Sequence, residues 1–191
     1  NYIIRDDATG QSFADHLIAA ATRGVPVRVL YDHWGCRRTG RAFWRRLRDG
    51  GVTVTAFNKV NPLFPRRALV RDHRKYVSVD GWRAVVGGLC VGDEWAGDAT
   101  KHRLPWRDTA AEIRGPAVPV LDLTFEHAWQ LASAARTPRT KHRTGRAHLA
   151  GATPGARIPH RVESCGEAVV RVIEGGPGRH RVERVVQTLA G

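Results

Sequence analysis

Two residues suited to phosphoryl chemistry, His73 and Lys75, stand two positions apart at the start of a β-rich run. Side chains alternate along a β-strand, so residues at i and i+2 project from the same face. A neutral imidazole nitrogen can attack phosphorus, and a fixed ammonium group stabilises negative charge on the non-bridging oxygens. The pair therefore predicts a site that acts on a phosphate ester.

The residues after this pair make the signal more specific. His-x-Lys is followed after four residues by Asp80-Gly81, and Gly87-Gly88 ends the next β-rich run. The whole run resembles the HKD motif of the phospholipase D superfamily. Its extension through residues 92–95 (Gly-Asp-Glu-Trp) resembles the bacterial cardiolipin synthase branch. The resemblance covers the order of elements from Tyr2 to Trp129, and it includes residues 5–10, 105–109 and 113–118.

The resemblance implies roles for three residues. His73 would be the nucleophile or the acid/base partner, and Lys75 would bind the substrate phosphate. Asp108 would be the carboxylate behind the imidazole, where it fixes the tautomer and stabilises the protonated ring. The alternative for Asp108 is a surface acid beside Arg107.

Four further residues belong to the candidate site. Asp80 is in the motif, but it falls on the opposite strand parity from His73 and occupies a predicted turn, so we expect its main role to be structural. Gly87 and Gly88 permit close approach of the backbone to a phosphate, although glycine also commonly ends a strand. Family members usually have Asn where this chain has Cys90. A thiol is a poor hydrogen-bond donor, so the phosphate is held more weakly here or is contacted from elsewhere.

Apolar periodicity predicts the elements that must position these residues. Helical spacing separates apolar strands, which gives β-α-β units and parallel pairing. Asp80-Gly81 suits a tight hairpin. The predicted fold class is α/β, a phospholipase D-like half with a mixed, largely parallel sheet flanked by helices. The predicted strands are 2–5, 25–31, 52–57, 75–79 and 83–86, and the predicted helices are 13–24, 42–47 and 118–132.

The sequence divides into three parts. Residues 1–132 are the predicted phospholipase D-like domain with the first HKD motif. Residues 133–166 are rich in Arg, Thr, Pro, Gly and His and predict a basic, flexible linker, with polybasic nucleic-acid contact at 136–146 as the alternative. Residues 167–191 predict the truncated start of a second repeat, with a strand at 168–173 and a helix at 182–189.

Composition narrows the class of partner. The 191 residues carry 31 Lys and Arg against 18 Asp and Glu, a formal net charge of +13. This charge favours anionic partners such as phospholipid headgroups or nucleic acid, although an Arg-rich codon bias would also produce it. No run approaches the roughly 18 to 20 apolar residues of a membrane span, so peripheral contact at the inner face of the membrane, from the cytoplasm, is expected.

No cofactor or metal is expected. The three cysteines, Cys36, Cys90 and Cys165, are odd in number and far apart, which favours neither disulfides nor a zinc site and suits a reducing compartment. The chain begins Asn-Tyr-Ile-Ile and contains no Met. This start looks like the inside of a longer protein, and the resemblance implies that the chain is its N-terminal phospholipase D-like half with the start of the second repeat.

The predicted function is phosphatidyl transfer or phosphodiester hydrolysis on a phospholipid resembling phosphatidylglycerol, through a covalent phosphohistidine. A second His protonates the leaving alcohol, and an alcohol or water then releases the product. None of His102, His142 and His180 has His-x-Lys spacing. A second HKD half, from a C-terminal region or a dimer partner, is therefore needed, and the isolated fragment should be inactive. The alternatives are a single-motif phosphodiesterase that dimerises on nucleic acid, and a non-catalytic binding remnant.

Overall fold

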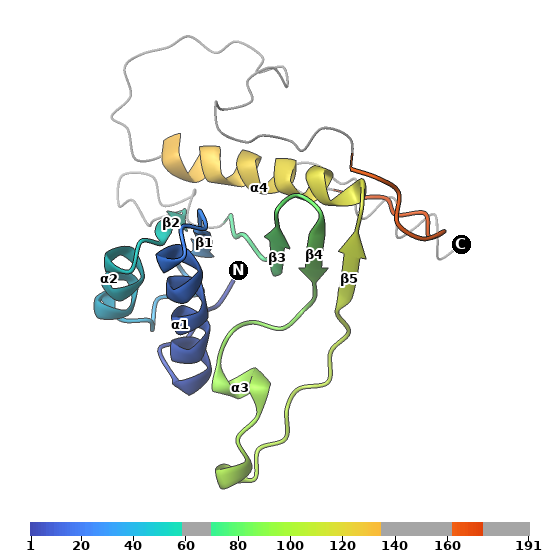
Figure 1. The fold of residues 1–191 in the computed structure, drawn as a ribbon. Helices are drawn as coiled ribbons and strands as arrows, with labels where there is room; N and C mark the ends of the chain where they lie inside the picture. Colours follow the sequence, from blue (N-terminus) through green and yellow to red (C-terminus); the bar gives the residue numbers. More distant parts are fainter. Residues whose placement is uncertain (59–69, 135–161, 174–191) are drawn as a thin grey trace.

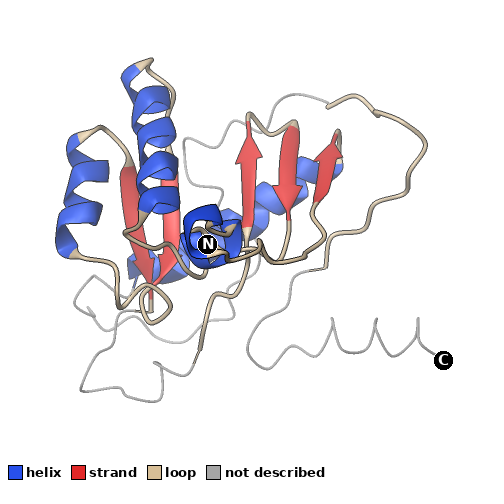
Figure 2. Cartoon of the chain, turned by 90° about the horizontal axis from the view of Figure 1, so that it is seen from below, coloured by secondary structure: helices blue, strands red, loops and turns tan. Residues whose placement is uncertain are grey.

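The computed structural model describes residues 1–58, 70–134 and 162–173 (Figure 1). Their helices and strands form two groups that lie side by side, a parallel pair of strands with two helices and an antiparallel sheet of three strands (Figure 2). A long helix, α4 (Ala117–Ala134), packs against both groups. The predicted mixed α/β class is confirmed.

The first group, called the parallel unit below, consists of α1 (Ala8–Thr22), β1 (Arg28–Asp32), α2 (Arg41–Asp49) and β2 (Thr53–Phe57). Strand β1 pairs with β2 in parallel register, as the predicted β-α-β unit requires. All but the first residue of each strand is buried, because helices or α4 cover the sheet. Apolar residues on both faces are typical of parallel strands covered in this way.

Local sequence explains the two helices of the parallel unit. Asp7 caps the start of α1, where its side chain accepts a hydrogen bond from the Gly10 N–H at 2.9 Å. The chain leaves α1 through Gly24, whose φ of +86° favours glycine. Helix α2 buries Phe43, Trp44 and Leu47 on one side and exposes its arginines on the other.

The second group, called the antiparallel sheet, contains β3 (Tyr76–Val79), β4 (Arg83–Val86) and β5 (Ala111–Arg114), in the order β3-β4-β5. The predicted hairpin between β3 and β4 is confirmed, with Asp80 and Gly81 at φ values of 53° and 64°. Positive φ at both central residues matches a tight type I′ turn. Ala84 on one face of this sheet packs with Val118 and Leu121 of α4.

The structure corrects some expectations. Within residues 1–58, 70–134 and 162–173, parallel strand pairing is limited to β1 and β2, so the sheet is parallel only in part. The predicted strand 2–5 forms a single bridge, between Ile4 and Val91, because its backbone pairs with the 90–91 segment for too short a distance. Residues 168–173 form no strand, although Val172 packs against the cluster under α4.

Several predicted segments lie outside the described residues. These are residues 135–161 of the predicted linker, which include the basic segment 136–146, and the predicted helix 182–189. Helix α4 was predicted at 118–132 and runs from Ala117 to Ala134. The loop from β4 to β5 carries a short helix, α3 (Asp93–Ala96), and one 3-10 turn, η2 (Ala99–Lys101), and it projects away from α4 (Figure 1).

Candidate active site

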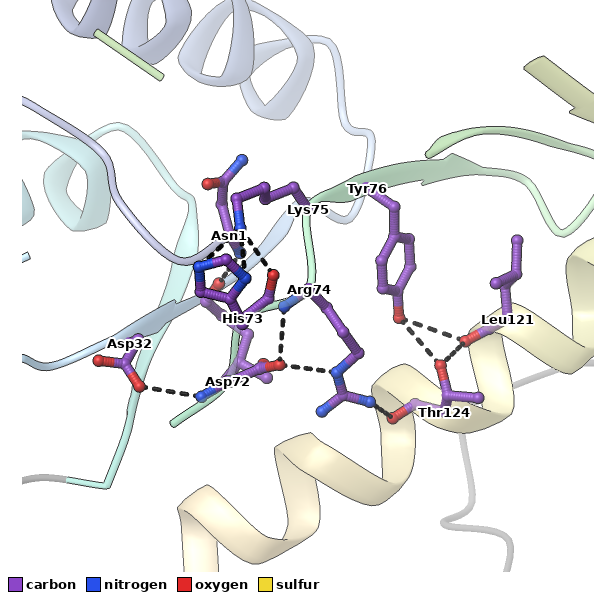
Figure 3. A network of polar contacts seen from close by, with 10 residues as sticks. Asn1, Asp32, Asp72, His73, Arg74, Lys75, Tyr76, Leu121 and Thr124 are labelled. Carbon is purple, nitrogen blue, oxygen red and sulfur yellow. Dashed lines mark hydrogen bonds and ion pairs between the residues drawn. The ribbon is translucent and has the colours of Figure 1, made fainter. Parts of the chain in front are cut away.

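His73 and Lys75 lie directly before β3, between the parallel unit and the antiparallel sheet (Figures 1 and 3). The Lys75 Nζ is 3.0 Å from the His73 Nδ1, 3.3 Å from its Nε2 and 2.8 Å from its carbonyl oxygen. The sequence predicted a strand that starts at Lys75, but β3 begins one residue later. The hydrogen bonding between β3 and β4 still extends to Lys75, because its carbonyl accepts a hydrogen bond from the Gly87 N–H at 3.1 Å.

The surroundings of the pair favour a neutral imidazole. Burial lowers the pKa of His73, and the Lys75 ammonium lowers it further, whereas Asp32 and Asp72 raise it. Lys75 is 8% exposed, and burial lowers its pKa against the opposing effects of Cys90, Asp72 and Asp108. A neutral ring nitrogen is the form that attacks phosphorus, and the ammonium beside it is placed to stabilise developing negative charge.

Asp32 ties the end of β1 to this segment. Its side chain is 1% exposed, and its Oδ2 accepts a hydrogen bond from the Asp72 N–H at 3.0 Å (Figure 3). Its Oδ1 accepts from the N–H groups of Trp34 and Gly35 at 3.0 and 2.9 Å. One carboxylate therefore holds both the loop after β1 and the residue before His73.

The sequence predicted no role for Asp32, which follows the predicted strand 25–31. A signal was present, because ligand sites in open α/β sheets lie beyond the carboxyl ends of the strands. A polar residue at the end of an apolar strand is a candidate for such a site.

Asp72 and Arg74 connect the site to α4. The Arg74 Nε lies 2.7 Å from the Asp72 Oδ1, and the Arg74 Nη1 donates to the Thr124 carbonyl at 3.0 Å (Figure 3). The Tyr76 hydroxyl donates to the Leu121 carbonyl at 3.2 Å. The residues that flank His73 and Lys75 are thus fixed to a helix some 50 positions away in the sequence.

Tyr2 provides an aromatic wall beside the pair, a role that the sequence did not predict. Its ring centroid lies 4.5 Å from that of His73, at an interplanar angle of 49°. The Lys75 Nζ lies 5.3 Å from the same ring centroid, within cation–π range. Tyr2 therefore restricts the movement of both candidate catalytic side chains.

Asp108 meets the backbone of Gly88. Its Oδ2 accepts a hydrogen bond from the Gly88 N–H at 2.6 Å, and in the described part of the chain it makes no hydrogen bond to His73. A Cβ added at Gly88 would lie 2.8 Å from the Asp108 Oδ1, and one added at Gly87 would lie 3.1 Å from the Ala110 Cβ. A side chain at position 88 would therefore displace the Asp108 carboxylate, which is the end of a flexible side chain.

The last two predicted site residues lie in different places. Asp80 is in the β3–β4 turn, roughly 16 Å along the strand from Lys75 at 3.3 Å per residue. This position fits the structural role expected for it. Cys90 is buried, burial raises its pKa, and the nearby Lys75 ammonium opposes that rise. The raised pKa keeps Cys90 a neutral thiol.

Residues 1–93 match the family described as "Cardiolipin synthase, PLD-like domain". The chain carries a phospholipase D-like domain. This match includes His73, Lys75, the two glycines and Cys90, and it ends before Asp108. The resemblance that the HKD-like run predicted is confirmed.

Known cardiolipin synthases are similar to this chain beyond the phospholipase D-like domain. That of Geobacillus sp. (strain WCH70) is 37% identical over 177 residues, which cover 92% of this chain and 32% of the relative. Cardiolipin synthase A of Pseudomonas entomophila is 41% identical over 133 residues, which cover 69% of this chain and 28% of the relative. The chain thus spans about a third or less of the length of these relatives.

Two features are absent from the residues that the structure describes. No cluster of three or more His, Cys, Asp or Glu side chains within 1–58, 70–134 and 162–173 is arranged to hold a metal ion. In the same residues, no helix is both long and apolar enough to cross a bilayer.

Proposed function

We propose that this chain provides one half of a phosphatidyltransferase site that acts on phospholipids such as phosphatidylglycerol. The observation that carries the proposal is the contact of 3.0 Å between the Lys75 ammonium and an imidazole whose pKa is lowered. The names of the relatives support phospholipid as the substrate. Contact with the bilayer would be peripheral, at the inner face of the membrane.

In the proposed reaction His73 attacks the phosphorus, and a phosphorus–nitrogen bond forms as the bond to the leaving alcohol breaks. A second His, from another HKD half, protonates the departing alkoxide. An acceptor alcohol, or water, then loses a proton to that second His and attacks the phosphohistidine, which restores His73. Lys75 stabilises the charge on the non-bridging oxygens in both steps.

The proposed division of roles follows the geometry. Asp32 and Asp72 oppose the fall in the pKa of His73 and hold its segment in place. Asp108 would act through Gly88, whose backbone it holds, and it would orient His73 only after a change of partner. Cys90 occupies the position where family members usually have Asn, so we expect this chain to bind phosphate more weakly than they do.

The first test measures phosphatidylglycerol turnover in the protein that contains both this chain and a second HKD half. His73→Ala should remove turnover and the covalently bound phosphorus that denaturing gels detect. Asp80→Asn should leave turnover largely intact and lower only thermal stability. Near-normal turnover by His73→Ala would refute the assignment of His73.

The second test uses the 191-residue chain alone, with tungstate as a phosphate mimic in titration calorimetry. Lys75→Ala should weaken binding about tenfold or more, which is the loss of one charge-assisted hydrogen bond. Lys101→Ala removes an equal charge from an exposed position and should change little. Cys90→Asn should bind tungstate as well as the native chain or better, because an amide donates a stronger hydrogen bond than a thiol.

The net charge of +13 also favours a second candidate, a single-motif phosphodiesterase that dimerises on nucleic acid. Two chains would then contribute one His73 each across a two-fold axis. Sedimentation analysis together with a duplex DNA cleavage assay separates the candidates. A stable dimer that cleaves DNA, and loses cleavage with His73→Ala, would replace the phospholipid proposal.

A further inference from the structure

The loop between β4 and β5 exposes two large apolar side chains at its far end. Leu104 is 83% exposed and Trp106 is 63% exposed. In Figure 1 this loop extends away from α4 and from both strand groups. Contiguous exposed apolar side chains mark interaction sites, whereas single ones are ordinary on a protein surface.

Contacts within the loop hold these side chains outward. Asp98 and Arg103 exchange two backbone hydrogen bonds, of 2.8 and 2.9 Å, which close a turn around η2. The Trp106 N–H donates to the Trp95 carbonyl at 3.1 Å, and the two indole rings meet edge to face at 6.4 Å. Leu104 and Trp106 are therefore presented by a folded turn.

The same turn is rich in cations. Lys101, Arg103 and Arg107 are all exposed, and only Lys101 forms an ion pair within the described chain, with Asp98 at 3.0 Å. Two arginines thus flank the apolar pair without a carboxylate partner in the ranges that the structure describes. Apolar and aromatic groups bordered by arginine suit the interface of an anionic bilayer, where indole rings lie at headgroup level and cations meet phosphates.

We propose that residues 101–107, the loop tip, dock this chain on an anionic phospholipid bilayer, with Leu104 and Trp106 entering the boundary between headgroups and acyl chains. The proposal rests on the proposed function only for its identification of phospholipid as the substrate. The residue after the tip, Asp108, holds the Gly88 backbone beside the candidate site at 2.6 Å. Docking through the tip would therefore place the bilayer at the end of the loop that leads to the candidate site.

The antiparallel sheet offers a matched control surface. Val77 and Val79 are each 50% exposed on the face of this sheet that α4 does not cover. The charges near that face are already paired, because Arg83 and Arg114 both contact Glu112, at 2.7 and 2.6 Å. Among the described residues of this sheet, Arg83 and Arg114 therefore differ from the arginines of the tip in having a carboxylate partner.

The test measures co-sedimentation of the 191-residue chain with vesicles of phosphatidylcholine, with and without phosphatidylglycerol. Leu104→Ser with Trp106→Ser should reduce partitioning onto the anionic vesicles about tenfold or more. Arg103→Gln with Arg107→Gln should reduce it about tenfold on anionic vesicles and little on neutral ones. The controls, Val77→Ser with Val79→Ser and Arg41→Gln with Arg45→Gln, should bind like the native chain. Circular dichroism should show an unchanged fold for each variant.

Several outcomes would overturn the inference. It is wrong if the tip variants bind anionic vesicles as well as the native chain, or if the valine controls lose as much binding as the tip variants. It is also wrong if the native chain does not bind anionic vesicles. None of these results depends on His73, so tip docking and the proposed chemistry can fail separately. Loss of turnover in His73→Ala with unchanged vesicle binding would support both.

Discussion

The parallel unit and the antiparallel sheet bury their residues in different ways. In β1 and β2 every residue after the first is buried, whereas β3 and β5 have no buried residue and β4 buries only Ala84. The parallel unit has helices of its own, and the antiparallel sheet depends on α4 for its covered face. The candidate site lies between a well-packed group and a thinly covered one.

The difference shows how the site is held. The Asp32 carboxylate, at the end of the parallel unit, fixes the backbone before His73, while Lys75 leads into the antiparallel sheet. Helix α4 joins the two groups, since Ala128 packs under β1 and β2 and Val118 packs under the sheet. Rigidity at His73 is therefore supplied mainly from the parallel unit and from α4.

The largest expected effect is the loss of a core side chain in the parallel unit. Phe43 is buried in α2 and meets Trp44 edge to face, with ring centroids 5.1 Å apart. Phe43→Ala should lower the free energy of unfolding by about 3 to 5 kcal/mol, since it leaves a cavity in the core. Urea denaturation measures this. A loss below about 1 kcal/mol would mean that the parallel unit is not the better packed group.

The next effect concerns the joint between the two groups. Asp32→Asn should lower the free energy of unfolding by about 2 to 3 kcal/mol. Both carboxylate oxygens accept backbone N–H bonds, and the amide NH₂ that replaces one oxygen cannot accept them. Asp32 raises the pKa of His73, so its neutralisation should move the His73 titration to lower pH. Thermal unfolding and NMR titration of the His73 ring report the two effects. Asp49→Asn, at an exposed position of α2, serves as the control. If the pKa of His73 did not change in Asp32→Asn, Asp32 would not influence the candidate site electrostatically.

A smaller effect is expected where α4 meets β1. The Arg28 Nη1 lies 2.5 Å from the Glu126 Oε1, and its guanidinium lies over the Phe125 and Trp129 rings at 4.9 and 4.4 Å. Arg28→Ala should lower the free energy of unfolding by about 1 kcal/mol, since the ion pair with Glu126 is partly exposed and the contacts with the two aromatic rings add little more. Arg46→Ala removes an exposed ion pair with Asp15, between α2 and α1, and should lower the free energy of unfolding by less. If urea denaturation showed equal losses of unfolding free energy for the two variants, the contact between Arg28 and α4 would stabilise the fold no more than an ordinary surface ion pair.

The smallest effect is expected on the uncovered face of the antiparallel sheet. Val79→Thr should change the free energy of unfolding of the 191-residue chain by less than about 0.5 kcal/mol, because half of the Val79 side chain is already in water. Ala84→Thr, on the face that α4 covers, should cost about 1 to 3 kcal/mol through overpacking. If both substitutions cost the same, the two faces of the sheet would not differ as described.

Much of the fold followed from local sequence patterns. The helical spacing before and after β1 predicted the β-α-β unit, and Asp80-Gly81 predicted the hairpin. These features depend on residues close in the sequence, so a single chain reveals them. The strand predicted at 2–5 was reduced to one bridge, because a strand also requires a partner of sufficient length.

The candidate site was predictable in part for the same reason. His73 and Lys75 are two residues apart at the edge of a predicted strand, and their side chains meet although β3 begins at Tyr76. The Asp108 contact was harder to predict, because it depends on where a long loop returns. That loop brings the carboxylate to the Gly88 N–H.

The sequence by itself determined the reactive pair, the order of most elements and the family, since these are carried by short runs of neighbouring residues. Only the tertiary structure decided what surrounds the pair. Asp32 accepts a hydrogen bond from the Asp72 N–H, 40 positions away in the sequence, and Tyr2, at the start of the chain, lies against His73. Such contacts depend on how separate elements pack against one another. Spacing along the chain does not encode that packing, because loops of many lengths can close the same distance.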